Sequence, residues 1–431
     1  MAGFLLTILG MTVMAILVRG LAQPEGHLKG PFLFAAVYAI WVIPEIWSVL
    51  GSAEIPDGAL SLFMLMSLFC LLAFILGWSN GLKRGMRPDV ARPKPMDEGQ
   101  FKTMTVGMTA FAVAMTLALG LGDHEVAANG NWTGSSTILY FFSNLKAVAL
   151  CLSFLYFLRF RNATSIALLA VNCLLYMPVV LIYFRRRGMM EFALTLGLTF
   201  WFERRKVIPR AVVITALFLS TFVVFGIGML RALTPDGSLP SLHELMSADL
   251  VSVSPFQTSK TSPEVSNAAN LIYYSAAGLD FSYGGDTWNN FVFQFVPGQF
   301  IGFETKQSLM YSPSAAEFLQ SLGYDARNGT TLTGAADAFR EFGPFGVVFF
   351  LLIGRILGNY WAQASAGSKK YQIRYVLALV PALLSITAYA SYFFVNYFLY
   401  FLALLALERI VGFESTRAPA PRMAVQRAVR R

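Results

Sequence analysis

Charged residues are scarce in this chain. Only 13% of its 431 residues are Asp, Glu, Lys or Arg, whereas 56% are hydrophobic; soluble globular proteins carry roughly 25% charged residues. This shortage excludes a soluble globular protein of this length. The apolar runs are continuous and about 20 residues long, the length that a helix needs to cross the hydrocarbon, which argues against a β-barrel. We therefore expect an all-α polytopic membrane protein.

Histidine and cysteine are also rare, with three of each. The cysteines, Cys70, Cys151 and Cys173, lie inside apolar runs and form no CxxC pair, which favours small core residues over a disulfide framework. His243 is the sole histidine of the long loop described below, which excludes a histidine-rich metal site there. The P-loop, GxSxG, HExxH and dinucleotide-binding patterns do not occur in a suitable context.

The apolar runs predict about eleven transmembrane helices. Their approximate ranges are 3–18, 31–50, 58–78, 103–122, 137–158, 163–184, 188–202, 211–230, 343–362 and, within 375–408, two helices divided near 388–391. The N-terminal run lacks a basic start and a good cleavage site, so we interpret it as a retained helix rather than a signal peptide. The halves show no sequence repeat, which weakens a transporter with inverted repeats.

Positive charge predicts the orientation of these helices. The stretch 79–102 is rich in lysine and arginine, as cytoplasmic loops are. The N-terminus is then outside, and the basic tail 410–431 is inside. The helices form two groups, 1–230 and 343–409, separated by a large outer loop over 231–342. Orientation signals and lipid-headgroup contacts account for the net charge of +9, so we expect no nucleic acid as a partner.

The outer loop is rich in aromatic residues, whereas disordered segments are poor in them. We therefore expect an ordered loop, which is where function tends to reside on a membrane scaffold. The part 289–303 is apolar but interrupted by Pro297, and we expect it to lie in the membrane interface or to dip partly in. Residues 312–322 and 334–342 are predicted as short amphipathic helices, the second leading into the helix 343–362.

The arginine run Arg185–Arg187 lies on the wrong side of the membrane for the usual charge bias. The apolar segment that follows ends in a second basic cluster, Glu203–Lys206, so one of the two clusters must face outside. Snorkelling to lipid phosphates explains one such arginine well and three poorly. Because the guanidinium matches phosphate oxygens, we expect a phosphate or pyrophosphate ligand at the outer surface.

Two further interpretations of this region are open. A re-entrant path for 188–202 places both basic clusters on one side, but it also moves the basic tail outside, so we favour it less. Glu191 lies one helical turn beyond Arg187 and is a candidate ion-pair partner for it. Lys146, with Asn144, lies near the outer end of the helix 137–158 and is explained either by function or by snorkelling.

The segment Thr333–Gly343 carries charge at the membrane surface. Thr333 is a candidate helix cap, and Asp337 shares a helix face with Arg340 and Glu341, with an ion pair expected between Asp337 and Arg340. From spacing alone, a solvated amphipathic helix is the better interpretation of this segment. Single charges elsewhere in the loop, among them Asp286, are each interpreted as solvated loop residues.

This layout resembles the bacterial oligosaccharide repeat-unit polymerases of the Wzy type. One shared feature is a basic turn with a proline before the second helix, here Lys29-Gly30-Pro31. A second is an Arg-Gly start to a mid-chain helix, Arg187-Gly188, with a basic exit at Arg204–Lys206. The third is a run that closes the large outer loop, here Ala336–Gly343, where the family often has Gly-Glu-x-Tyr-x-Asn-Phe-Gly. This chain has aspartate for the glutamate and phenylalanine for the tyrosine of that run.

The resemblance implies glycosyl transfer at the outer, periplasmic face of the bacterial inner membrane. A glycan on undecaprenyl pyrophosphate would be transferred to a new lipid-linked repeat, with the pyrophosphate leaving. The implied partners are this lipid-linked oligosaccharide and membrane lipids, with flippase and chain-length regulator proteins as further candidates; no cofactor or metal is required. The aromatic residues of the loop would stack on sugar faces.

The resemblance also implies roles for individual residues. Arg187 would stabilise the leaving pyrophosphate, and Asp337 or Glu341 would act as general base on the acceptor hydroxyl. The implied substrate-binding residues are Arg185, Arg186, Arg231, Lys306 and Arg340. Other readings of the same layout are an O-antigen ligase, a transporter or flippase for a lipid-linked or anionic solute, and an assembly subunit without catalysis.

Overall fold

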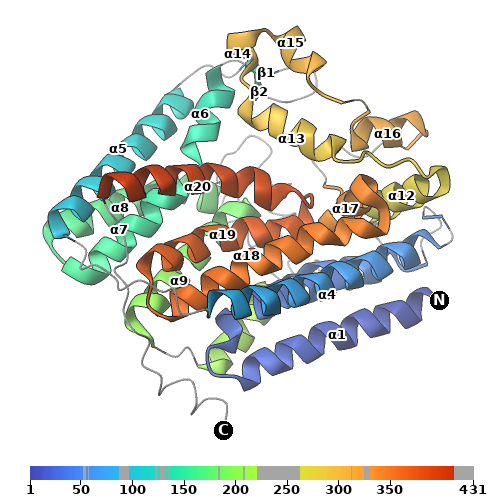
Figure 1. Ribbon diagram of the computed structural model, residues 1–431, viewed down its shortest axis with the longest axis horizontal. Coiled ribbons are helices and arrows are strands. Elements are labelled where there is room, and N and C mark those ends of the chain that lie inside the picture. The colour runs from blue at the N-terminus through green and yellow to red at the C-terminus, as the bar shows by residue number, and fades with distance from the viewer. Residues whose placement is uncertain are drawn as a thin grey trace, which may run out of the picture.

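The computed structural model describes residues 1–51, 55–56, 58–86, 97–121, 125–126, 132–133, 135–182, 185–206, 209–220, 263–311, 313–324 and 331–411. Nearly all of these residues are helical (Figure 1). The exceptions include one short antiparallel pair, β1 (Glu125–Val126) and β2 (Trp132–Thr133). The expected all-α class is therefore confirmed for the described part of the chain.

The first half contains nine labelled helices and two π-helical segments, with a further helix at its end. They are α1 (Ala2–Ala22), α2 (Gly30–Val37), η2 (Tyr38–Val42), α3 (Ile43–Val49), α4 (Ala59–Gly85), α5 (Glu98–Leu121), α6 (Ser135–Ser143), α7 (Lys146–Phe160), α8 (Ala163–Met177), η3 (Pro178–Ile182), α9 (Arg186–Arg204) and Arg210–Ser220, with the 3₁₀ turn η1 (Gly26–Leu28) before α2.

The second half has six helices between the two groups of expected spans and three long helices after them. They are α12 (Pro263–Gly278), α13 (Gly285–Phe295), α14 (Gly298–Ile301), α15 (Phe303–Ser308), α16 (Ala315–Ser321), α17 (Gly334–Phe342), the 3₁₀ turn η4 (Gly343–Val347), α18 (Val348–Ser365), α19 (Lys369–Thr387) and α20 (Tyr392–Val411).

Eight of the described helices are long and apolar enough to cross a membrane. They are Ala2–Ala22, Gly30–Val49, Ala59–Gly85, Glu98–Leu121, Ser136–Phe160, Ala163–Val180, Gly334–Ser365 and Tyr392–Arg409. The chain is thus a multi-pass membrane protein. Helices α9 and α19 also form where spans are expected, and α19 ends at Thr387 before α20 begins at Tyr392, so the expected division of 375–408 is correct. The count of about eleven spans stays a prediction.

Helices α4 and α18 pack side by side along their length (Figure 1). Glycines on both helices let the two backbones approach closely. A Cβ on Gly77 of α4 would lie 2.0 Å from the Leu351 carbonyl oxygen, and one on Gly354 of α18 would lie 2.1 Å from the Phe74 oxygen. The hydrophobic effect does not drive helices together within lipid. Small residues allow the close van der Waals packing that holds membrane helices together instead.

The loop helices pack onto the membrane helices rather than standing apart from them. α16 and α17 match the two amphipathic helices expected at 312–322 and 334–342. The expectation of a solvated helix at 334–342 is wrong, because every residue from Gly334 to Glu341 is buried. The backbone of Gly334 touches that of α19, where a Cβ would lie 1.6 Å from the Ser385 oxygen.

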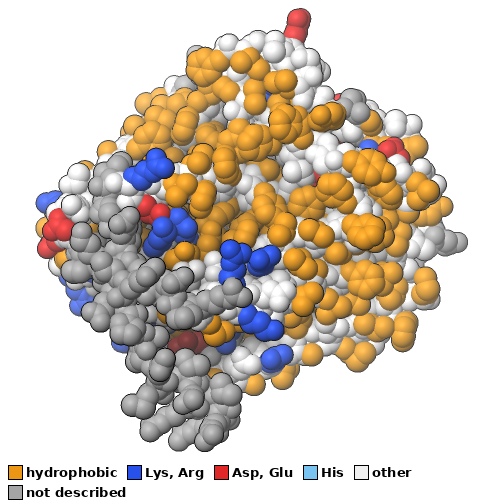
Figure 2. Space-filling model, viewed as in Figure 1, with side chains coloured by type: hydrophobic (Ala, Val, Ile, Leu, Met, Phe, Trp, Pro, Cys, Tyr) orange, Lys and Arg blue, Asp and Glu red, His pale blue; other side chains and the backbone are white. Residues whose placement is uncertain are grey.

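The surface reflects the membrane setting. Hydrophobic side chains cover most of the face in Figure 2, and most of the lysine and arginine on that face gathers toward its lower left. In Figure 1, α1 begins at one end of the long axis and α20 ends at the other. The described chain therefore starts and finishes at opposite ends of the bundle.

Candidate functional site

Arg187 lies where three helical segments meet. It stands in the first turn of α9, and its guanidinium donates a hydrogen bond to Asn144 Oδ1 at 3.1 Å, in the turn between α6 and α7. The guanidinium also lies over the Tyr392 ring at the start of α20, 5.6 Å from its centroid. Both partners are uncharged, and no carboxylate of the described residues lies within 4.0 Å of this guanidinium.

The expected ion pair between Arg187 and Glu191 is therefore not made. Glu191 is buried, and its two carboxylate oxygens accept hydrogen bonds from the phenols of Tyr176 at 3.0 Å and Tyr400 at 2.7 Å. These tyrosines belong to α8 and α20, so Glu191 ties three helices together. Glu191 faces the inside of the bundle, and there each of its two carboxylate oxygens already accepts a hydrogen bond from a phenol.

Lys146 is a second cation near Arg187. It begins α7, two residues after Asn144, and its amine lies 5.3 Å from the centroid of the Tyr176 ring. No carboxylate in the described part of the chain forms an ion pair with it. We call Asn144, Lys146, Arg187 and Tyr392 the arginine site. Its two cationic side chains make no direct ion pair with a described residue, although the buried carboxylate of Glu191 attracts both of them.

Of the two neighbouring arginines, Arg186 points to other partners, whereas Arg185 lies near enough to Lys146 for their charges to repel. Arg186 forms an ion pair with Glu264 of α12 at 4.0 Å and lies over the Trp41 ring of η2 at 5.6 Å. It therefore connects the start of α9 to α12 and η2. Arg185 is exposed at the N-cap position of α9. Arg186 is thus separated from the other two arginines of the run that was expected to bind phosphate together.

Glu341 of α17 is fully buried and holds the turn that leads into α13. It accepts hydrogen bonds from the Thr287 backbone N–H at 2.5 Å, the Thr287 hydroxyl at 2.6 Å and the Ser282 hydroxyl at 3.0 Å. The backbone N–H groups of Ser282 and Tyr283 in turn bind the last carbonyls of α17. This network makes Glu341 a structural anchor in the state described here.

Arg340 is also buried, with only 2% of its side chain exposed. It pairs with Asp280 at 3.3 Å and with Asp286 at 3.8 Å, and it lies over the Phe318 ring of α16. The expected pair between Asp337 and Arg340 is therefore wrong, because the guanidinium points toward the loop helices instead. Asp286, expected to be solvated, is buried too.

Burial and the nearby charge of Glu341 raise the pKa of Asp286 to about 6, against the opposing effect of Arg340. One of its oxygens, Oδ1, accepts a hydrogen bond from the Ala315 N–H at the start of α16, while Oδ2 has no hydrogen-bond donor among the described residues. Asp286 and Arg340 thus form a buried, incompletely satisfied polar pair.

Asp337 connects α17 to α20. It is buried, and its Oδ2 accepts a hydrogen bond at 2.9 Å from the Ala390 N–H, just before α20 begins. Tyr392, two residues on, lies beneath Arg187. The α17 carboxylate and the arginine site therefore share the start of α20. Thr333 occupies the N-cap position of α17, but its hydroxyl does not form the expected capping hydrogen bond.

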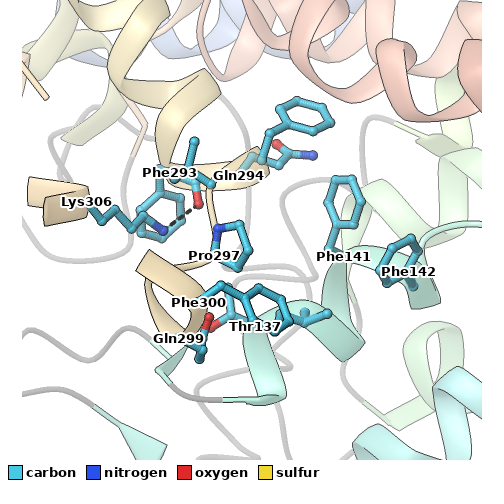
Figure 3. A pocket seen from close by; sticks show the side chains of 12 residues that line it. Thr137, Phe141, Phe142, Phe293, Gln294, Pro297, Gln299, Phe300 and Lys306 are labelled. Carbon is cyan, nitrogen blue, oxygen red and sulfur yellow. Dashed lines mark hydrogen bonds between the residues drawn. The ribbon is translucent and has the colours of Figure 1, made fainter. Parts of the chain in front are cut away.

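Lys306 of α15 lies at the edge of an aromatic pocket (Figure 3). Its amine donates a hydrogen bond to the Phe293 carbonyl at 2.9 Å and lies 4.9 Å from the centroid of that residue's ring. Burial lowers the pKa of this amine. Arg231, the remaining expected substrate-binding residue, lies outside the described residues. The described residues include no group of three or more histidine, cysteine or acidic side chains suited to a metal ion.

Sequence reasoning missed the residues that complete these clusters. Tyr176, Tyr400 and Tyr392 are far from Arg187 and Glu191 along the chain, so no local spacing connects them. Asn144 and Lys146 carried a signal, since a polar pair inside an apolar run is costly unless it is used. No protein-family model matches this chain, and neither a curated protein nor a solved structure does.

Proposed function

We propose that this protein polymerises lipid-linked oligosaccharide repeat units into a polysaccharide at the outer face of the bacterial inner membrane. The observation that supports the proposal most is the arginine site, where Arg187 and Lys146 lie together without an ion-pair partner. The donor would be a glycan on undecaprenyl pyrophosphate, and the product would be O-antigen, capsule or exopolysaccharide. The enzyme would be a membrane glycosyltransferase without a nucleotide-sugar substrate.

The arginine site suits a pyrophosphate leaving group. Negative charge grows on the pyrophosphate as its bond to the sugar breaks, and preorganised cations stabilise that charge most where water is scarce. Arg187 supplies a planar fork of donors, and Lys146 supplies a point charge. The N-terminus of α9 lies in the same region, and helix N-termini favour anions.

The carboxylates of α17 have a different place in this proposal. Asp337 and Glu341 remain the candidates for a general base, but their oxygens accept hydrogen bonds from the protein itself. This geometry favours a positioning role: Glu341 fixes α13, and Asp337 fixes the start of α20 beneath Arg187. Arg340 and Arg186 serve the same purpose through their acidic partners, Asp286 and Glu264.

Glu191 favours a second candidate function, a flippase for the same lipid-linked glycan. A charged residue buried between helices is expensive and is typical of transport paths. The segment η3, which contacts α9, is also irregular, since it is π-helical. The arginine site itself fits both functions, so the two must be separated by where the substrate accumulates.

The test replaces Arg187 by alanine and by lysine in the native host and profiles polysaccharide length at equal protein level. We expect long chains to fall about 100-fold or more in both variants, the cost of losing one charge-stabilising donor. Arg161→Ala, at the exposed end of α7, is the matched control and leaves the profile unchanged.

The single lipid-linked repeats show which function is lost. In cells that carry an Arg187 variant, repeats that accumulate on the periplasmic face of the inner membrane support a polymerase. Repeats that accumulate on the cytoplasmic face support the flippase instead. Normal long chains in both variants would overturn both proposals.

A further inference from the structure

A pocket of about 200 Å³ lies between α6 and the α13–α14 turn (Figure 3). Rings dominate its lining, from Phe141 and Phe142 on one side and Phe293, Phe295 and Phe300 on the other. For comparison, an apolar cavity of about 150 Å³ binds benzene. The pocket therefore has room for a short length of hydrocarbon, and its walls suit one.

The segment that forms one wall carries no charge. From Thr287 to Phe303 there is no acidic or basic residue, and the stretch contains five phenylalanines and a tryptophan. Several of these rings have no protein cover; Phe300 is 80% exposed and Phe303 is 65% exposed. Such a surface is stable where it meets lipid rather than water.

Aromatic contacts hold this segment against two membrane helices. Phe295 packs edge-on against Phe141 of α6, with ring centroids 5.2 Å apart, and against Phe398 of α20, at 5.4 Å. Both partner residues belong to candidate membrane spans, Ser136–Phe160 and Tyr392–Arg409. The pocket is thus continuous with surfaces that face the bilayer. In Figure 1, α14 and α15 lie at one edge of the molecule, beyond the end of α6.

We propose that this pocket binds an acyl chain of a bilayer phospholipid, which enters sideways between α6 and α14. The bilayer supplies such chains wherever these spans cross, and the wall from Thr287 to Phe303 carries no charge to hold an ionic ligand. The polar groups are few, and the amine of Lys306 is held at the edge by the Phe293 carbonyl. This proposal does not depend on the polymerase activity.

Photolabelling tests the occupant directly. The full-length protein is placed in nanodiscs of phosphatidylethanolamine and phosphatidylglycerol that contain a phospholipid with a diazirine near the end of one acyl chain. After irradiation, mass spectrometry maps the labelled peptides. We expect adducts on 137–142 and on 293–300.

Two variants with equally exposed rings provide the comparison. Phe300→Asp places a charge in the pocket mouth and should lower the pocket adducts about tenfold. Phe345 is 79% exposed on η4 and does not line the pocket, so Phe345→Asp should leave them unchanged. Because both side chains are exposed, neither change removes a core contact.

Three results would overturn the proposal. One is the absence of pocket adducts in the unchanged protein, and another is an equal loss in both variants. The third is displacement of the phospholipid by a photoactive polyprenyl phosphate at low mole fraction, which would assign the pocket to the carrier lipid. Polysaccharide length, measured separately, reports on the polymerase proposal alone.

Discussion

Asp286 and Arg340 place a charged pair inside the loop helices, and the pair gives the protein a pH dependence. The pKa of Asp286 is about 6 against a usual 3.8, so between these values the folded state binds more protons than the unfolded state. Stability then falls as pH rises from about 4 to 6 and is constant above that range. The size of the loss is about 2 to 3 kcal/mol.

The thermal unfolding transition in detergent, recorded from pH 4 to pH 8, checks this prediction. The unchanged protein should lose stability relative to Asp286→Asn across pH 4 to 6, because the amide cannot titrate. Asp280→Asn is the control, since this half-exposed residue also faces Arg340. Parallel curves for the unchanged protein and Asp286→Asn would contradict the assignment.

At this scale the sequence predicted which residues are unusual better than it predicted their contacts. Arg187 stood out because its predicted side of the membrane is unusual for arginine, and it does lie in a polar cluster. Its pairing with Glu191 was inferred from helical spacing, yet Tyr400 of a distant helix takes that carboxylate. Long-range hydrogen bonds of this kind depend on packing, which local periodicity does not encode.

Among the helices, the contact of α4 with α18 tolerates little change. A Cβ on Gly354 would lie 2.1 Å from a backbone oxygen of α4, and the backbone cannot yield as a side chain does. We expect Gly354→Ala to destabilise the protein by about 1 to 3 kcal/mol or more, the usual cost of overpacking.

The measurement is the thermal transition in detergent together with the amount of protein in the membrane fraction. Gly107→Ala is the matched control, because Gly107 lies within helix α5 with nothing within 4 Å of the added Cβ. That variant should be neutral or slightly stabilised, since alanine is the better helix former. If Gly354→Ala and Gly107→Ala have the same thermal transition, the α4–α18 contact tolerates the added Cβ and the prediction is wrong.

Helix positions followed closely from hydrophobic runs and prolines. Pro297 marks the break between α13 and α14, and the division of 375–408 falls between α19 and α20. The burial of α17 did not follow, because its alternation of small and charged residues is typical of a solvated helix. Its charges are instead satisfied by Ser282, Thr287 and Asp280, residues that lie far away in sequence.

For the whole molecule, the two ends of the described chain lie at opposite ends of the bundle. We therefore expect an odd number of crossings, with the N-terminus periplasmic and the tail cytoplasmic. Reporter fusions check this: a reporter after Lys94 should be active only in the cytoplasm, and one inserted after Gly323 only in the periplasm. Activity of both on one side would contradict the predicted topology.

The membrane class was evident from composition, whereas the arrangement of the loop helices was not. Composition reports how much apolar surface must be covered, but many arrangements cover it equally. The segment 289–303 was expected in the membrane interface, and its exposed rings are consistent with that place. The pocket beside it arises only when α6 and α13 are brought together.

The start of α20 contacts two parts of the chain that are distant in sequence. Asp337 accepts a hydrogen bond from the Ala390 N–H, and the Arg187 guanidinium lies over the Tyr392 ring. Selection acting on one part therefore constrains the other. In related sequences, segments 331–342 and 388–392 should covary, and a chimera that exchanges only one of them should lose activity. Exchanging both together should restore it, so these two short segments are inherited as one unit.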